Sequence, residues 1–300
     1  MHYTRVFEGA LIQEKEAGVT GNKKLRVTLL FLALLALHPA GGAMANEKKI
    51  TLNENLSVTE IEKDVFVVNH SFPWSSNSLL IRVSNSDCIL VNTLCDNQGA
   101  RMLVDWMKSS LGEVNLVAIN TGFHVDNIGG NAFLLSKGIA VYGSDLTAKL
   151  VAERGQKEKN RLLEEFKLPE NRKYYDAYKD LTFVPPNRIF DINQGLLLKI
   201  GDEDVNVFYP GPSHTLDNVV VYFPKRKILF GGCMIKSLDS KDAGYTADAD
   251  MQKWPRSVEK VLSVYKDAKI VVPGHGNYGD TTLIKHTIEL LDKVNKQVAK

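Results

Sequence analysis

The chain repeats one order of elements twice: short apolar runs typical of β-strands, then amphipathic segments typical of helices. In the first half the strand-like runs lie at residues 66–68, 79–81, 89–91, 114–120 and 140–142, with helical patterns at 97–111 and 129–137. In the second half the strand-like runs lie at 196–200, 205–209, 219–223, 228–230 and 270–273, with helical patterns at 256–267 and 281–297. Sheets with one apolar face must cover it, so this order predicts an α/β fold in which two sheets pack together and helices lie outside.

The composition is that of a packed protein without a strong charge signal. The chain has 300 residues, 44% of them hydrophobic and 24% charged, with 37 Lys and Arg against 35 Asp and Glu. A near-neutral balance gives no electrostatic footprint for nucleic acid, so we predict no nucleic-acid partner. We further expect a small-molecule substrate and a monomer.

Residues 1–45 have the order of a secretory signal. Lys23, Lys24 and Arg26 precede an apolar run of 11 residues at 27–37, which is followed by a Pro-Gly break and the triplet Ala43-Met44-Ala45. The run is too short for a permanent membrane anchor. A buried core helix is the alternative. We therefore predict a leader over 1–45, a single domain over 46–300, and a periplasmic protein that does not stay bound to the membrane.

Residues 145–180 form a long, charged segment with a helical pattern of apolar residues. Two interpretations remain open: a helix pair on the solvated surface, or a lid over a site.

Loops that follow predicted strands carry side chains of the kinds that bind metals. His124 and Asp126 stand two residues apart, while His214, Cys233 and His275 each have a glycine within three residues. Glycine lets the backbone pack closely around a site. Imidazole, thiolate and carboxylate together suit Zn²⁺ and make a Ca²⁺ or Mg²⁺ site improbable. Taken singly, each residue has a plain structural alternative; together they predict a zinc site.

From about residue 55 onward the chain resembles the metallo-β-lactamases of the subclass that normally binds two zinc ions. The stretches that carry the resemblance are NTGFHVDNIGGN, GPSHTLDNVVVYFPKRKILFGGCMIK and VVPGHG. The branch with an extended helical insertion is the most similar, with residues 145–180 as that insertion. The resemblance implies an αββα sandwich with metals at one edge and hydrolysis of the β-lactam amide bond of antibiotics.

Carried over by motif, the resemblance assigns Asp126, Cys233 and His275 to one zinc site and His124 and His214 to another. The third ligand of the latter should be a histidine at position 122, where this chain has Gly122. Two outcomes stay open: one tight zinc, or a second and weaker zinc held through His124, His214 and water. With one zinc, Asp126 and the two histidines of the incomplete site are the candidates that position and deprotonate the attacking water.

The resemblance also implies three substrate contacts. Lys236 matches the lysine that meets the substrate carboxylate, with a surface lysine as the alternative. Tyr245 stands where the family often has asparagine, and Trp74 lies in a loop that resembles the mobile flap over bound antibiotic, with a core role as its alternative.

Three functions are compatible with these residues. The first is a β-lactamase, biased toward carbapenems as in the one-zinc subclass. The others are a different hydrolase of the same fold, such as a lactonase or thioesterase, and a weakly active zinc-binding relative.

Overall fold

Two β-sheets face each other in the computed structural model, which describes residues 47–298. The first sheet holds β1 to β8 in sequence order, and the second has the order β13-β12-β11-β10-β9. The strands of the first sheet are β1 (Lys48–Asn53), β2 (Leu56–Glu62), β3 (Val65–Ser71), β4 (Ser75–Arg82), β5 (Asp87–Val91), β6 (Asn115–Ile119), β7 (Ala140–Ser144) and β8 (Arg188–Phe190). Those of the second are β9 (Leu196–Ile200), β10 (Glu203–Phe208), β11 (Val220–Phe223), β12 (Ile228–Gly232) and β13 (Ile270–Pro273).

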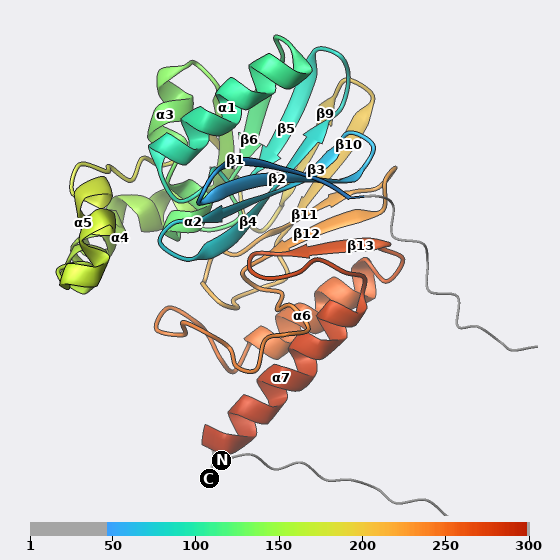
Figure 1. Cartoon of the computed structure of the whole chain (residues 1–300). Helices are drawn as coiled ribbons and strands as arrows, with labels where there is room; N and C mark the ends of the chain where they lie inside the picture. The colour runs from blue at the N-terminus through green and yellow to red at the C-terminus, as the bar shows by residue number, and fades with distance from the viewer. Residues whose placement is uncertain (1–46, 299–300) are drawn as a thin grey trace, which may run out of the picture. The chain divides into compact units, whose positions relative to one another are not determined.

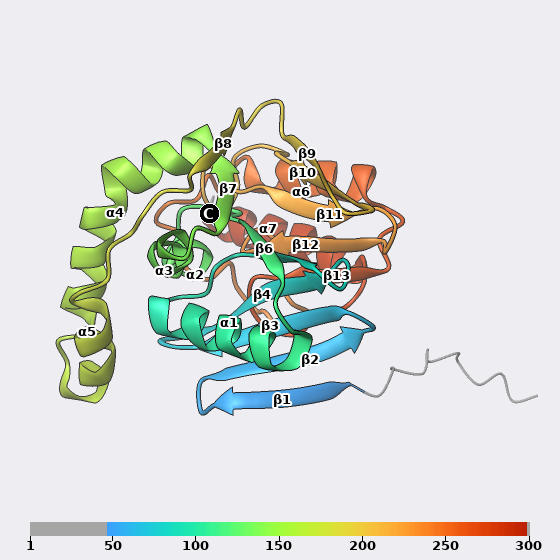
Figure 2. The same cartoon turned by 90° about the horizontal axis from the view of Figure 1, so that it is seen from above.

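Helices cover the outer faces of the two sheets, which gives the predicted αββα order (Figures 1 and 2). The helical segments of residues 47–298 are α1 (Asn97–Leu111), α2 (Val125–Ile128), α3 (Asn131–Ser136), α4 (Asp145–Glu165), the 3₁₀ turn η1 (Pro169–Asn171), α5 (Arg172–Tyr178), α6 (Trp254–Val264) and α7 (Thr282–Val298). In Figure 1, α1 and α3 lie on the side of the first sheet, and α6 and α7 on the side of the second.

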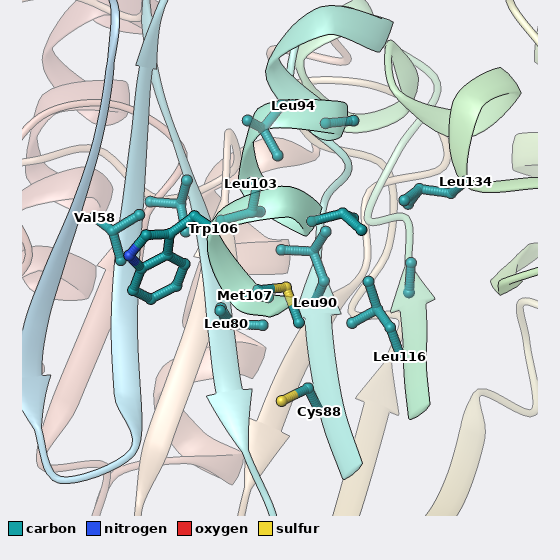
Figure 3. Close-up of a cluster of buried hydrophobic side chains, with 14 of the residues drawn as sticks. Val58, Leu80, Cys88, Leu90, Leu94, Leu103, Trp106, Met107, Leu116 and Leu134 are labelled. Atoms are coloured by element: carbon teal, nitrogen blue, oxygen red, sulfur yellow. The ribbon is translucent and has the colours of Figure 1, made fainter. Parts of the chain in front are cut away.

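Three apolar layers hold this stack together. Between the sheets, side chains such as Val67 and Ile89 pack against Val221 and Phe230. On the outer face of the first sheet, Leu103 of α1 and its neighbours fill the layer drawn in Figure 3. A third layer joins α6 and α7 to the second sheet. Strands such as β5, β11 and β12 are thus buried on both faces, which accounts for their near-continuous apolar runs in the sequence.

The direction of the strands explains why the candidate ligands meet. Strands β5, β6 and β7 are parallel, and so are β12 and β13. Parallel neighbours end at the same edge of a sheet. The loop after β6 carries residues 120–124, and Cys233 and His275 follow within two residues of the ends of β12 and β13. One edge of the sandwich therefore collects the polar loops.

The α/β fold and the two packed sheets are confirmed, and most predicted helices agree with the structure within a few residues. The predicted helix at 97–111 is α1, whereas the pattern at 129–137 is divided between α2 and α3. Strands β1, β2 and β8 are not among the predicted elements. The segment at 145–180 forms α4, η1 and α5.

The predicted leader over 1–45 lies outside the described residues. Those described belong to one compact unit. None of the helices within residues 47–298 combines the length and the apolar stretch that a membrane crossing requires.

Candidate metal centre

Three of the predicted ligands lie against one another at the polar edge. The Oδ2 atom of Asp126 is 3.2 Å from Sγ of Cys233 and 3.4 Å from Nε2 of His275, and the latter two atoms are 3.6 Å apart. One ligand atom from each of the three lies within 4.8 Å of the others. This spacing suits three ligands around one tetrahedral ion.

Local backbone features bring these three side chains together. Asp126 sits in the first turn of α2, two residues after the helix N-cap His124. Gly274 lies between the ends of β12 and β13, and a Cβ atom there would be 2.6 Å from the backbone nitrogen of Cys233. Only a residue without a side chain permits this approach. Gly274, next to His275 in the sequence, is therefore needed for the close packing of these two loops.

The hydrogen bonds and charges of these three residues fit a divalent cation. Nδ1 of His275 donates to the carbonyl oxygen of Ser75 at 2.7 Å, so that Nε2 is the ring nitrogen that faces the other two ligands. A ring nitrogen fixed in this way is the usual arrangement of a metal-binding histidine. Burial and the Asp126 carboxylate raise the pKa of the Cys233 thiol well above its ordinary value. A bound cation would reverse that effect, because thiolate is the form that ligates.

Whereas the pKa of Cys233 is raised, that of Asp126 is lowered. Burial acts to raise it, but the hydrogen bond and charge of His275, followed by the charge of His124, bring it well below its usual range. Asp126 is therefore an anion at neutral pH, buried at the centre of the group.

His124 and His214 form a second pair beside this triad. Their rings lie 5.1 Å apart and nearly perpendicular. Nε2 of His124 is 3.0 Å from Oδ2 of Asp248, and Nδ1 of His214 is buried with no hydrogen-bond partner among residues 47–298. Within the same residues no third histidine, cysteine or carboxylate forms a metal-binding group with these two.

Burial and charge affect the two histidines differently. Burial acts to lower the pKa of His124, but the hydrogen bond to Asp248 and the charge of Asp126 outweigh it, and the pKa is raised. Burial, with the charges of His124 and Lys236, lowers the pKa of His214 well below its ordinary value. His214 is therefore a neutral imidazole.

A cavity of about 450 Å³ opens over these groups. Its walls include all three predicted substrate contacts, Trp74, Lys236 and Tyr245, together with Asp126 and the three histidines. Cys233 lies beneath, almost fully buried. The structure thus brings every predicted site residue to one place.

The sequence profile of the Metallo-beta-lactamase superfamily matches residues 71–275, which is more than half of the chain. The chain belongs to the metallo-beta-lactamase superfamily. A metallo-beta-lactamase type 2 of Bacillus cereus is 33% identical over 252 residues, which cover 82% of this chain and 87% of that protein. The type 2 enzyme of Bacteroides fragilis is 28% identical over 90% of this chain and 98% of its own length. The crystal structure of the DIM-1 metallo-beta-lactamase matches with a TM-score of 0.66 and 30% identity, covering 82% of this chain and all of that one.

Several residues of this metallo-beta-lactamase site escaped the sequence analysis. Asp248 contacts His124, and Arg154 contacts Asp248 at 3.2 Å. Glu158, Arg161 and Glu165 of α4 line the cavity. In the sequence they belong to a charged helical stretch, where nothing distinguishes a residue that faces a site from one that faces solvent. Residues 145–180 form a helix pair, as in the first of the two interpretations, and one side of α4 lines the cavity.

Proposed function

We propose that this protein hydrolyses the amide bond of β-lactam antibiotics with a zinc ion held by Asp126, Cys233 and His275. The observation that carries the proposal is the grouping of these carboxylate, thiol and imidazole atoms within 4.8 Å, at a cavity that also contains Lys236. Membership of the superfamily and the similarity to type 2 enzymes support the same reaction.

A zinc ion at this site would supply Lewis acidity, polarising the lactam carbonyl and lowering the pKa of a water molecule to about 7. His124, His214 and Asp126 all face the cavity and are the residues that hold and orient the attacking water. The neutral imidazole of His214 can accept a hydrogen bond from that water, and Asp248 fixes the ring of His124 through Nε2. Direct attack by water requires no covalent intermediate on a serine or cysteine.

Three residues of the cavity wall are suited to hold the substrate. Lys236 is nearly buried, and its ammonium lies 5.2 Å from the centre of the Trp254 ring. That position fixes a cation for the carboxylate that β-lactams carry next to the lactam ring. Trp74 supplies an apolar surface, and Tyr245 offers a partly exposed phenol.

We further propose that one zinc binds tightly. In the family motif the first histidine of HxHxD is a ligand, and Gly122 has no ligand atom to replace it. A Cβ atom at position 122 would lie 2.6 Å from Nδ2 of Asn218. Asn218 is held in turn by hydrogen bonds with Thr121 and Thr215. The place of the missing side chain is thus occupied, and any zinc bound by His124 and His214 would have to complete its coordination with water.

The Gly122→His variant tests this account. We expect it to bind one tight zinc, as the parent does, and to lose about 1 to 3 kcal/mol of unfolding free energy because the new side chain displaces Asn218. Urea unfolding and metal analysis measure both effects. Adding Asn218→Ala should recover part of the stability. Two tight zinc ions in the parent protein would contradict the one-zinc proposal, and a Gly122→His variant as stable as the parent would show that Asn218 does not occupy the place of the missing side chain.

The reaction itself is tested with purified protein and three substrates: a carbapenem, a penicillin and a lactone. We expect hydrolysis of the carbapenem that a chelator abolishes and added zinc restores. Lactone hydrolysis without lactam hydrolysis would point to the alternative hydrolase, and no turnover with bound zinc would indicate a non-catalytic relative.

The leader predicted over 1–45 supports export, and we propose that the mature enzyme acts as a monomer in the periplasm, where β-lactams reach their targets. Mass spectrometry of the exported protein and its sedimentation would test the two statements.

A further inference from the structure

The α4–α5 hairpin, residues 145–178, contacts both loops that border the cavity. One is the flap between β3 and β4, residues 72–74. The other, which we call the 236–250 loop, carries Lys236, Tyr245 and Asp248. In Figures 1 and 2 the hairpin stands at one side of the sandwich.

The contacts with the flap come from α5 and are mostly aromatic. The ring of Phe72 meets that of Tyr174 edge to face at 4.9 Å and lies 6.4 Å from that of Tyr178. The buried hydroxyl of Tyr178 lies 3.0 Å from the carbonyl oxygen of Cys95 and 3.3 Å from that of Phe72, and its proton is donated to these two acceptors. Cys95 directly precedes the N-cap of α1. Tyr178 therefore ties the backbone of the flap to the fixed body of the first sheet.

The contacts with the 236–250 loop come from α4. The guanidinium carbon of Arg161 lies 5.0 Å from the centre of the Tyr245 ring. Arg161 is itself held by Glu158 at 2.7 and 2.9 Å and by Glu165 at 3.0 Å. A planar cation fixed in this way meets the ring at a low entropic cost. About two helical turns earlier in α4, Arg154 pairs with Asp248.

We propose that the α4–α5 hairpin is a clamp that fixes the distance between the flap and the 236–250 loop and so selects substrates by size. Tyr178 and Arg161 are its two positioning residues. The selection of β-lactams rests on the function proposed above, whereas the clamp itself rests only on the contacts. A flap held in place excludes substrates whose side chains need it to open, and it spares compact substrates the entropic cost of ordering it.

Two variants release the clamp, and each has a matched control on the same hairpin. Tyr178→Phe removes only the hydroxyl; Tyr175→Phe makes the same change at a tyrosine whose hydroxyl has no hydrogen bond within residues 47–298. Arg161→Gln removes the cation over Tyr245; Arg172→Gln removes a similar cation that lies 4.9 Å from the ring of Tyr175, outside the cavity.

The first readout is amide hydrogen exchange of residues 71–76 without substrate. We expect faster exchange in Tyr178→Phe than in the parent and in Tyr175→Phe. The second readout is the ratio of kcat/KM for a compact carbapenem to that for a cephalosporin with a bulky acyl side chain. In both releasing variants this ratio should fall about threefold to tenfold, the range set by one hydrogen bond or cation–π contact.

The controls should keep the parental ratio, and Tyr178→Phe should keep kcat for the carbapenem within about twofold, as expected when a positioning contact is lost. Unchanged exchange in Tyr178→Phe would overturn the clamp. Faster exchange with an unchanged ratio in both variants would overturn its role in selection. If the parent hydrolyses no β-lactam, the proposed function fails, and the exchange comparison still decides whether the clamp exists. If Tyr178→Phe does not fold, Arg161→Gln decides by its ratio, because Arg161 lies at the partly exposed cavity wall.

Discussion

Replacing Cys233 by alanine is expected to lower the affinity for zinc by more than about a hundredfold, the upper end of what losing an outer hydrogen-bond partner of a metal ligand costs. Cys233 supplies the one soft ligand of the triad. Its loss leaves only Oδ2 of Asp126 and Nε2 of His275, which lie 3.4 Å apart, to hold the ion. β-Lactam hydrolysis at limiting zinc should fall in proportion to occupancy. A competition titration against a chromophoric chelator, together with turnover of a carbapenem, measures both quantities.

Cys88→Ala is the matched control. Cys88 is also buried and free, but it lies in the apolar layer under α1, with no ligand beside it. This variant should lose some stability through the cavity it creates and keep the zinc affinity of the parent. Equal zinc affinity in Cys233→Ala and the parent would show that the thiol is not a ligand.

Lys236→Ala should raise KM for β-lactams by about tenfold to a hundredfold, since a hydrogen-bonded pair between an ammonium and a carboxylate is stronger than a neutral one. The effect is large because the ammonium is held against Trp254 inside the cavity rather than in free solvent. Steady-state kinetics with a penicillin and its methyl ester give the test. The ester lacks the charge, so its KM should respond much less.

Lys241→Ala serves as the control, because this lysine lies in the same loop with its side chain exposed. Removing it should leave KM nearly unchanged. If both variants behave alike, Lys236 contributes only to the general charge of the loop and not to binding of the carboxylate.

The ligands could be predicted from the sequence because each follows a strand and has a glycine nearby, as His275 has Gly274. Strand ends collect at one edge of a parallel arrangement, so residues far apart in the chain share a place in the fold. The helix at 97–111 was predictable because its apolar residues recur at helical spacing. Ligands at strand ends and apolar residues at helical spacing are both local patterns in the sequence, and the fold determines where these residues lie in space.

The charged residues that contact and support the site residues could not be predicted in this way. Asp248 and Arg161 have no local pattern that distinguishes them from other charged residues, and their roles depend on how α4 lies against the 236–250 loop. The partly exposed strand β1 likewise lacks a strong apolar run, since it forms an edge of the first sheet. Contacts between distant segments, rather than periodicity, determine these features.

Zinc X-ray absorption of the protein loaded with one equivalent of zinc tests the central claim most directly. Coordination by Cys233, Asp126 and His275 predicts one sulfur at about 2.3 Å and nitrogen or oxygen ligands at about 2.0 to 2.2 Å. The sulfur contribution should disappear in Cys233→Ala. A first shell of nitrogen and oxygen alone in the parent would contradict the account.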